Sequence, residues 1–197
     1  MASEVLTANT YCCLAIIGPL VAIAVGWYFF SIYNSLIFLR NQIDKAWANI
    51  DVLLKQRSDL IPNLVNSVKG YMKYEREVLT EITTLRASII SATGLKEKAM
   101  VNERISAALK SIFAVAENYP KLRASENFLK LQEQLTAIEN QIADRREFYN
   151  DSVLLYNTRI KTFPYLLVAI LLGMKEKEYF KVTEEEKKEV NVAFEEK

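Results

Sequence analysis

The sequence predicts an all-α protein, in which an N-terminal transmembrane helix continues into an antiparallel four-helix bundle of long helices. Three observations support this fold class. The chain has 197 residues but only five Gly and four Pro, fewer turn formers than a sheet protein of this length needs. Its N-terminal part contains a long apolar run without charge. Beyond that run, apolar residues recur at helical spacing.

The apolar run over residues 11–32 predicts a membrane helix. The chain carries no charge from Val5 to Leu39, and about 20 apolar residues cross a hydrocarbon core of about 30 Å. Trp27 and Tyr28 stand where an interfacial aromatic belt is expected. A cleaved signal peptide is the alternative, but it needs a basic start, and Glu4 is the only charge before the run. We expect a short tail over 1–10, the anchor over 11–32, a helical domain over 33–181 and a charged tail over 182–197.

Charges on either side of the anchor predict its orientation. The residues before it carry no Lys or Arg, whereas Arg40, Lys45, Lys55 and Arg57 follow it. By the positive-inside rule, we expect a single-pass protein of the cell membrane, with its N-terminus outside and its bundle in the cytoplasm.

Small residues in the anchor predict helix packing within the membrane. Gly18, Ala22 and Gly26 recur at four-residue spacing, which lets two helix backbones approach closely. The alternative is that Gly and Ala are simply common in membrane helices. Cys12 and Cys13 are either acylated or plain apolar residues, and as the only two cysteines they cannot staple a disulfide scaffold.

Turn-forming residues divide the remaining chain into helices over about 31–61, 62–92, 96–118 and 121–162. Pro62 either starts a new helix or kinks a continuing one, and Gly70 is a second possible stop. Gly94 and Pro120 mark loops, and Pro164 ends the last long helix. If Gly70 is the main turn and no hairpin forms near Gly94, three long helices result instead.

One Arg interrupts each of two apolar seams. Apolar residues recur in steps of three and four over 43–64, around Arg57, and over 128–156, around Arg145. A buried Arg needs an acidic partner on a facing helix, whereas an Arg at the edge can extend to solvent along its apolar stem. We expect both to set the register of the bundle and not to catalyse a reaction. Polar side chains expected to share this role are Asn49, Asp51 and Asn150.

A second apolar run over residues 165–173 is too short to span a membrane. We expect it to cap the core of the bundle. It could instead contact the bilayer surface or a neighbouring subunit, through Leu166, Leu167, Ile170 and Leu171. Four antiparallel helices would return this run to the membrane-proximal end, whereas three would leave it roughly 60 Å away.

Composition excludes several functions. The chain has no His, the usual general base and commonest metal ligand, which rules out catalytic triads, His-metal sites and zinc fingers. A net charge of +1 provides no field to attract nucleic acid. The five Gly are isolated, so no phosphate-binding loop is present. We expect no cofactor and no enzymatic activity.

The motifs of the helical domain resemble those of the LemA family of bacterial and archaeal membrane proteins. The resemblance covers Tyr33 to about Lys181 and includes Ala46-Trp47-Ala48-Asn49-Ile50-Asp51-Val52, Asp59-Leu60-Ile61-Pro62-Asn63-Leu64-Val65, Ala116-Glu117-Asn118-Tyr119-Pro120 and Glu139-Asn140-Gln141-Ile142-Ala143. The chain departs from the family at Leu53-Leu54-Lys55-Gln56-Arg57, where a double-basic cluster is usual, and at Tyr74-Glu75, where His often precedes Glu. The resemblance implies a four-helix bundle on one membrane helix, and no reaction.

Three functional hypotheses follow. The first is a structural membrane protein that forms homo-oligomers and organises or shapes the bilayer, which agrees with family members in organelle-forming gene sets of magnetic bacteria. The second is a monomeric adaptor that binds another membrane protein, such as a protease or a signalling partner. The third is an enzyme or a small-molecule binder in the bundle core. We favour the first hypothesis.

Overall fold

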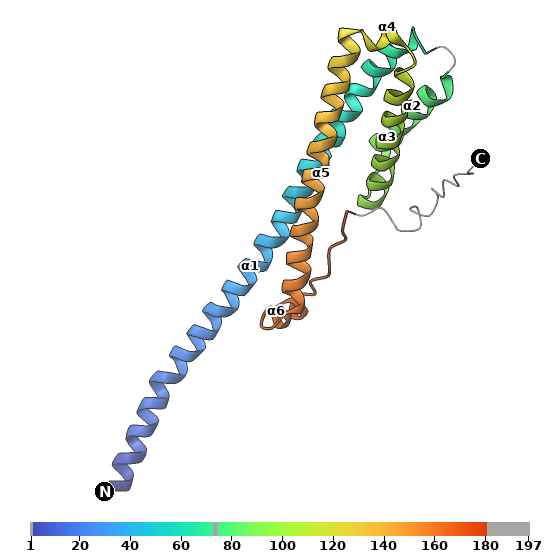
Figure 1. Ribbon diagram of the computed structural model, residues 1–197. Coiled ribbons are helices and arrows are strands. Elements are labelled where there is room, and N and C mark those ends of the chain that lie inside the picture. Colours follow the sequence, from blue (N-terminus) through green and yellow to red (C-terminus); the bar gives the residue numbers. More distant parts are fainter. Residues whose placement is uncertain (1, 73–74, 181–197) are drawn as a thin grey trace, which may run out of the picture. The chain divides into compact units, whose positions relative to one another are not determined.

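The computed structural model describes the backbone of residues 2–72 and 75–180, and side chains from residue 17 onward within those ranges (Figure 1). The described elements are helices: α1 (Ala2–Lys69), α2 (Arg76–Ser91), α3 (Leu95–Ala116), α4 (Pro120–Arg123), α5 (Glu126–Lys161) and α6 (Tyr165–Leu171). The predicted fold class is therefore confirmed, with a long N-terminal apolar helix followed by further helices. The up-and-down arrangement of a four-helix bundle stays a prediction.

At Pro62 the structure has the second of the two alternatives, a continuing helix, so the division between 31–61 and 62–92 does not occur. α1 continues through Pro62 to Lys69, and the chain turns at Gly70 and Tyr71. α2 is consequently shorter than expected, with 16 residues, whereas the breaks near Gly94 and Pro120 lie where the sequence placed them. α1 also includes residues 2–10 of the expected N-terminal tail, while the charged tail over 182–197 lies outside the described residues.

Loss of the Pro62 amide proton is compensated by another helix. Pro cannot donate the usual hydrogen bond to the carbonyl four residues earlier, which belongs to Ser58. The side chain of Arg86 in α2 donates its Nε–H to that carbonyl oxygen, at 3.1 Å. Since Ser58 is buried, an unpaired carbonyl there would be costly. The contact explains how a helix can run through a proline.

The chain divides into two compact units. Unit 1 comprises the residues up to Asp44 together with Ser152–Lys177. Its buried side chains come from one face of α1, from the end of α5 and from α6: Ile32, Leu36, Leu39, Ile43, Val153, Tyr156, Ile160, Val168 and Ala169. The steps of four and three along α1 are those of a helix that packs along its length.

Unit 2 runs from Lys45 to Asp151 and resumes at Glu178. Helices α2, α3 and α4 lie wholly within it, together with parts of α1 and α5. Its core includes side chains from all five of these helices: Ile50, Ile61, Leu64, Ile82, Leu85, Ile105, Ile112, Leu122, Phe128, Leu135 and Ile142. Fully burying one such side chain stabilises the fold by about 1.5–3 kcal/mol.

Candidate functional site

The N-terminal part of α1 carries an apolar surface without protein cover. Among the described residues, α1 is the one helix long and apolar enough to cross a membrane. Its large side chains between Ile17 and Phe30 are exposed, apart from the half-buried Phe29, and Trp27 keeps 80% of its surface. Packing within unit 1 begins at Ile32. A soluble helix would cover such a surface, so lipid is the solvent that fits it.

The small residues expected to pack in the membrane lie on this open surface. Gly18 and Ala22 are exposed and Gly26 is half-exposed. A methyl group added at either Gly would meet no atom within 4 Å. The stripe is therefore accessible to a neighbouring helix. Trp27 and Tyr28 are exposed beside it, as an interfacial belt requires.

Helix α6 adds a second apolar surface to unit 1. Val168 and Ala169 are buried, so one side of the helix packs on the core, as expected of a cap. The residues predicted to contact membrane or subunit are on the exposed surface: Leu166, Leu167, Ile170 and Leu171. Ile170 keeps 69% of its surface and Leu171 keeps 72%. α6 therefore packs on the core through Val168 and Ala169, while its larger apolar side chains remain exposed.

The end of α6 lies beside α1, just beyond the expected anchor. A hollow in unit 1 is lined by Leu172 and Gly173 and by Tyr33, Ile37 and Arg40 of α1. These α1 residues follow directly on the expected span of 11–32. The second apolar run therefore ends near the part of α1 that follows the expected anchor, which favours the arrangement at the membrane-proximal end.

Tyr156 belongs to the same hollow and is almost fully buried. Burial raises the pKa of its phenol, and the positive charge of Arg40 opposes that shift. The side chain of Asn157 binds the backbone of Lys177 through both its donor and its acceptor, at 2.9 Å each. An ion pair between Lys177 and Asp44, at 3.4 Å, ties the same segment to α1.

Arg57 forms a buried polar centre in unit 2, which is the first of the two alternatives that the sequence left open for it. It keeps 1% of its surface, and its guanidinium lies among three helices. One Nη donates to Glu139 of α5 at 2.5 Å and to Ser106 of α3 at 3.1 Å. The other donates to the side-chain oxygen of Asn102, at 2.5 Å. Burial lowers the pKa of the guanidinium, and the Glu139 carboxylate opposes the shift.

This centre has the properties of a structural register device. The two Nη groups of the guanidinium bind side chains on α3 and α5, so a slip by one turn would leave a charge buried without these partners. No group of three acidic or sulfur ligands that could hold a metal occurs in the part of the chain that the structure describes. Ser106 adds to the cluster by donating to the other carboxylate oxygen of Glu139, at 2.5 Å, so α1, α3 and α5 are joined at one point.

Of the two alternatives for Arg145, the structure has the second, because its side chain is exposed to solvent. Arg146, one position later, is half-buried and pairs with Glu103 of α3. The apolar spacing of three and four residues over 128–156 predicts that position 145 faces the bundle. In the structure, the arginine that faces α3 is the next residue, Arg146. Asn49 is likewise exposed, whereas Asp51 pairs with Lys98 of α3.

Asn150 has a role that sequence reasoning missed. Its side chain accepts a hydrogen bond from the backbone N–H of Phe180, at 2.8 Å, and donates to the Phe180 carbonyl, at 3.3 Å. Phe180 is buried, with its ring centroid 5.9 Å from that of Trp47 and the Arg146 guanidinium 4.8 Å from its ring. The signal available was a lone apolar Phe in a charged segment, with Asn residues seven apart on α5.

The apolar helix, the second apolar surface and the helical packing define a class, namely membrane-associated helical proteins. The LemA family model matches residues 46–194, more than half of the chain. The chain therefore belongs to the LemA family. The match extends into the segment expected as a separate tail.

Named relatives agree with this assignment. Magnetosome protein MamQ 2 of Paramagnetospirillum magneticum is 24% identical, over 75% of this chain and 64% of its own length. Magnetosome protein MamQ of Magnetospirillum gryphiswaldense is 22% identical over the same shares. Protein LemA of Metamycoplasma hominis is 27% identical, over 81% of this chain and 74% of its own length. The chain thus spans less than two thirds of the magnetosome relatives, and none of these names designates an enzyme.

Proposed function

We propose that this protein is a non-enzymatic structural component of the cell membrane that self-associates and organises or shapes the bilayer. The observation that carries the proposal is the continuity of α1, in which a lipid-facing segment runs without a break into the helical domain. A continuous helix holds the start of the helical domain at a fixed distance and angle from the membrane segment. A flexible linker would let the domain move independently of that segment. Relatives named as magnetosome proteins support a role at a membrane compartment.

Self-association through the anchor is supported by the open stripe of Gly18, Ala22 and Gly26. Close backbone approach is the main source of helix association in lipid. The excess of Lys and Arg after the anchor supports an N-terminus outside the cell and a cytoplasmic helical domain. The partners are then the bilayer and further copies of the chain.

The subunit mass tests the proposal. The full-length protein is purified in mild detergent or native lipid, and its mass is measured by light scattering with the detergent contribution subtracted. A discrete multiple of 22.6 kDa supports an assembly. A monomer contradicts it and favours an adaptor that binds another membrane protein, which crosslinking would then identify.

Substitution of the stripe tests the contact within the membrane. We expect Gly18→Leu with Gly26→Leu to weaken association by about tenfold, or about 1.4 kcal/mol, because the added side chains keep the backbones apart. Ala24→Leu, on the opposite side of α1, is the matched control and should leave the mass unchanged. Unchanged stoichiometry in the double variant would refute this contact.

A further inference from the structure

Helix α6 exposes more apolar surface than a helix that only caps a core. Leu167 keeps 60% of its surface, and Ile170 and Leu171 keep still more. Phe163, just before the helix, is also exposed. Only Val168 and Ala169 are buried in this helix. An apolar patch of this kind marks a contact with a partner or with a membrane.

The position of α6 in unit 1 indicates which contact it makes. The hollow that joins Leu172 and Gly173 to α1 reaches Tyr33 and Arg40. These residues lie one to eight positions beyond the expected span, or about 12 Å at most along the helix axis. The headgroup region on each side of the hydrocarbon core is about 5–8 Å thick. The C-terminal end of α6 therefore lies near the point where α1 is expected to leave the hydrocarbon core.

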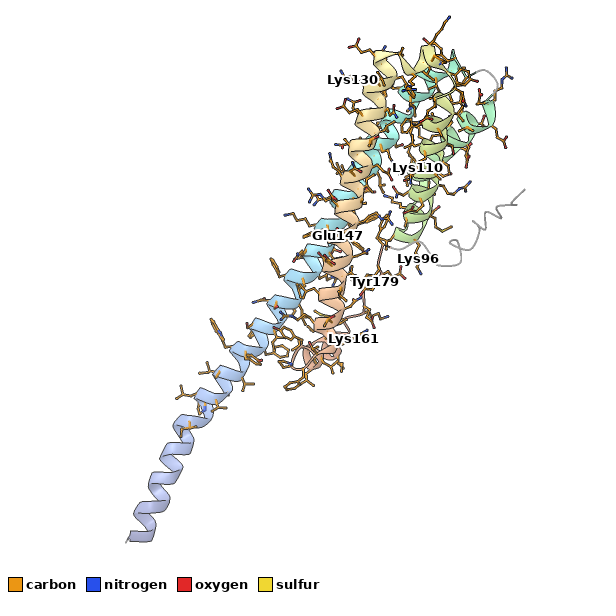
Figure 2. All side chains as sticks on the ribbon, in the orientation of Figure 1. Lys96, Lys110, Lys130, Glu147, Lys161 and Tyr179 are labelled. Carbon is orange, nitrogen blue, oxygen red and sulfur yellow. The ribbon has the colours of Figure 1, made fainter. Side chains whose placement is uncertain are left out.

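Charge distribution around α6 fits a lipid surface. No charged residue occurs from Thr162 to Met174. Arg159 and Lys161 precede this stretch, and Lys175 and Lys177 follow it in alternation with Glu176 and Glu178. Lys161 pairs with Glu176 at 2.8 Å, so charged groups lie at both ends of the apolar stretch and not within it. Figure 2 labels Lys161, the last residue of α5, at the entry to α6. A short apolar face with charged groups at its ends suits a segment that rests in the headgroup region of a membrane.

We infer that α6 inserts its exposed face into the interfacial region of the same bilayer that α1 crosses. The protein then has two membrane contacts, a spanning helix and a short helix on the surface. The second contact restricts the angle at which α1 emerges from the bilayer surface. This inference shares the anchor α1 with the proposed function, and it does not require self-association.

Lipid-dependent quenching tests the inference on the full chain. Cys12→Ser and Cys13→Ser remove the native thiols, and Ile170→Cys carries an environment-sensitive fluorophore. The protein is reconstituted in phosphatidylcholine–phosphatidylglycerol vesicles at a high lipid-to-protein ratio. Ile90→Cys is the matched control, because Ile90 is an equally exposed apolar residue, on α2 in unit 2. Leu167→Cys provides a second probe on α6 if the first disturbs the fold.

We expect the emission of the α6 probe to shift to the blue, with quenching by nitroxide-labelled lipids and protection from aqueous iodide. The probe at position 90 should be quenched by aqueous iodide and not by nitroxide-labelled lipids, and its emission should not shift to the blue. Iodide quenching of the α6 probe as strong as that of the control would overturn the inference. Protection from both quenchers would also overturn it, since a second subunit would then cover α6. Neither result depends on the mass of the assembly. A failed α6 experiment therefore does not contradict self-association, which the mass measurement tests separately.

Discussion

Arg57 shows how one residue can determine the register of several helices. Its guanidinium is buried, and its donors are directed at Asn102 and Ser106 on α3 and at Glu139 on α5. A charged group in this position is stable only while those acceptors remain. The residue was identified from sequence because it interrupted an apolar seam, but its partners were not. They come from helices 45 and 82 positions away, whose facing sides depend on the packed structure.

Removal of the acidic partner should destabilise unit 2. We expect Glu139→Ala to lower the free energy of unfolding by about 2 kcal/mol, because the buried guanidinium loses its carboxylate acceptor. Guanidinium chloride unfolding in detergent micelles measures this, with Trp47 fluorescence as the probe in a Trp27→Phe background. Arg145→Met, at an exposed position, is the control and should change stability by less than about 0.5 kcal/mol. Equal effects in both variants would contradict the role of the pair.

Asn150 shows a second side chain with a positional role. Its side chain accepts a hydrogen bond from the backbone N–H of Phe180 and donates one to the carbonyl oxygen of the same residue. We expect Asn150→Ala to cost about 1–2 kcal/mol, because a buried N–H loses its acceptor. Phe180→Ala should cost about 3 kcal/mol through lost burial. The same unfolding experiment applies, since Trp47 packs on Phe180.

Asn49→Ala is the matched control for Asn150. The two residues have the same chemistry and the same sequence-based expectation, but Asn49 is exposed. Its removal should leave the unfolding free energy unchanged. If Asn49→Ala and Asn150→Ala were equally destabilising, the hydrogen bonds between Asn150 and Phe180 would not explain the loss of stability in Asn150→Ala.

At the scale of the element, α1 continues through a proline because α2 supplies the missing donor. Sequence could only leave open whether Pro62 kinks or starts a helix. The Arg86 side chain, 28 positions away, bonds to the Ser58 carbonyl that Pro62 leaves unpaired. The turn then falls at Gly70, and α2 loses the residues that α1 gains.

A double-mutant cycle tests this compensation. Arg86→Met should cost about 1 kcal/mol or more in the native background, where the buried Ser58 carbonyl loses its donor. In a Pro62→Ala background the same change should cost little, because the alanine introduced there has a backbone N–H that can donate instead. Arg104→Met, at a surface arginine 3.9 Å from Glu81, is the control. Equal costs of Arg86→Met in both backgrounds would show that Pro62 and Arg86 are not coupled.

At the scale of the whole molecule, flanking charges predict the side of the membrane on which the helical domain lies. A cysteine at Ile90, which is exposed, in a chain without Cys12 and Cys13, reports that side. We expect it to resist membrane-impermeant thiol reagents in intact cells and to react after permeabilisation, because the basic residues after the anchor favour the cytoplasm. Rapid labelling in intact cells would place the domain outside.

The sequence by itself determined the all-α class, the apolar anchor and the breaks near Gly94 and Pro120. These follow from local properties, namely uninterrupted hydrophobicity, helical spacing and residues that cannot continue a helix. Only the tertiary structure decided the path through Pro62, the partners of Arg57, the exposure of Arg145 and the position of α6 beside Tyr33. Each of those depends on contacts between segments far apart in the chain, and their energies arise only when the helices pack together.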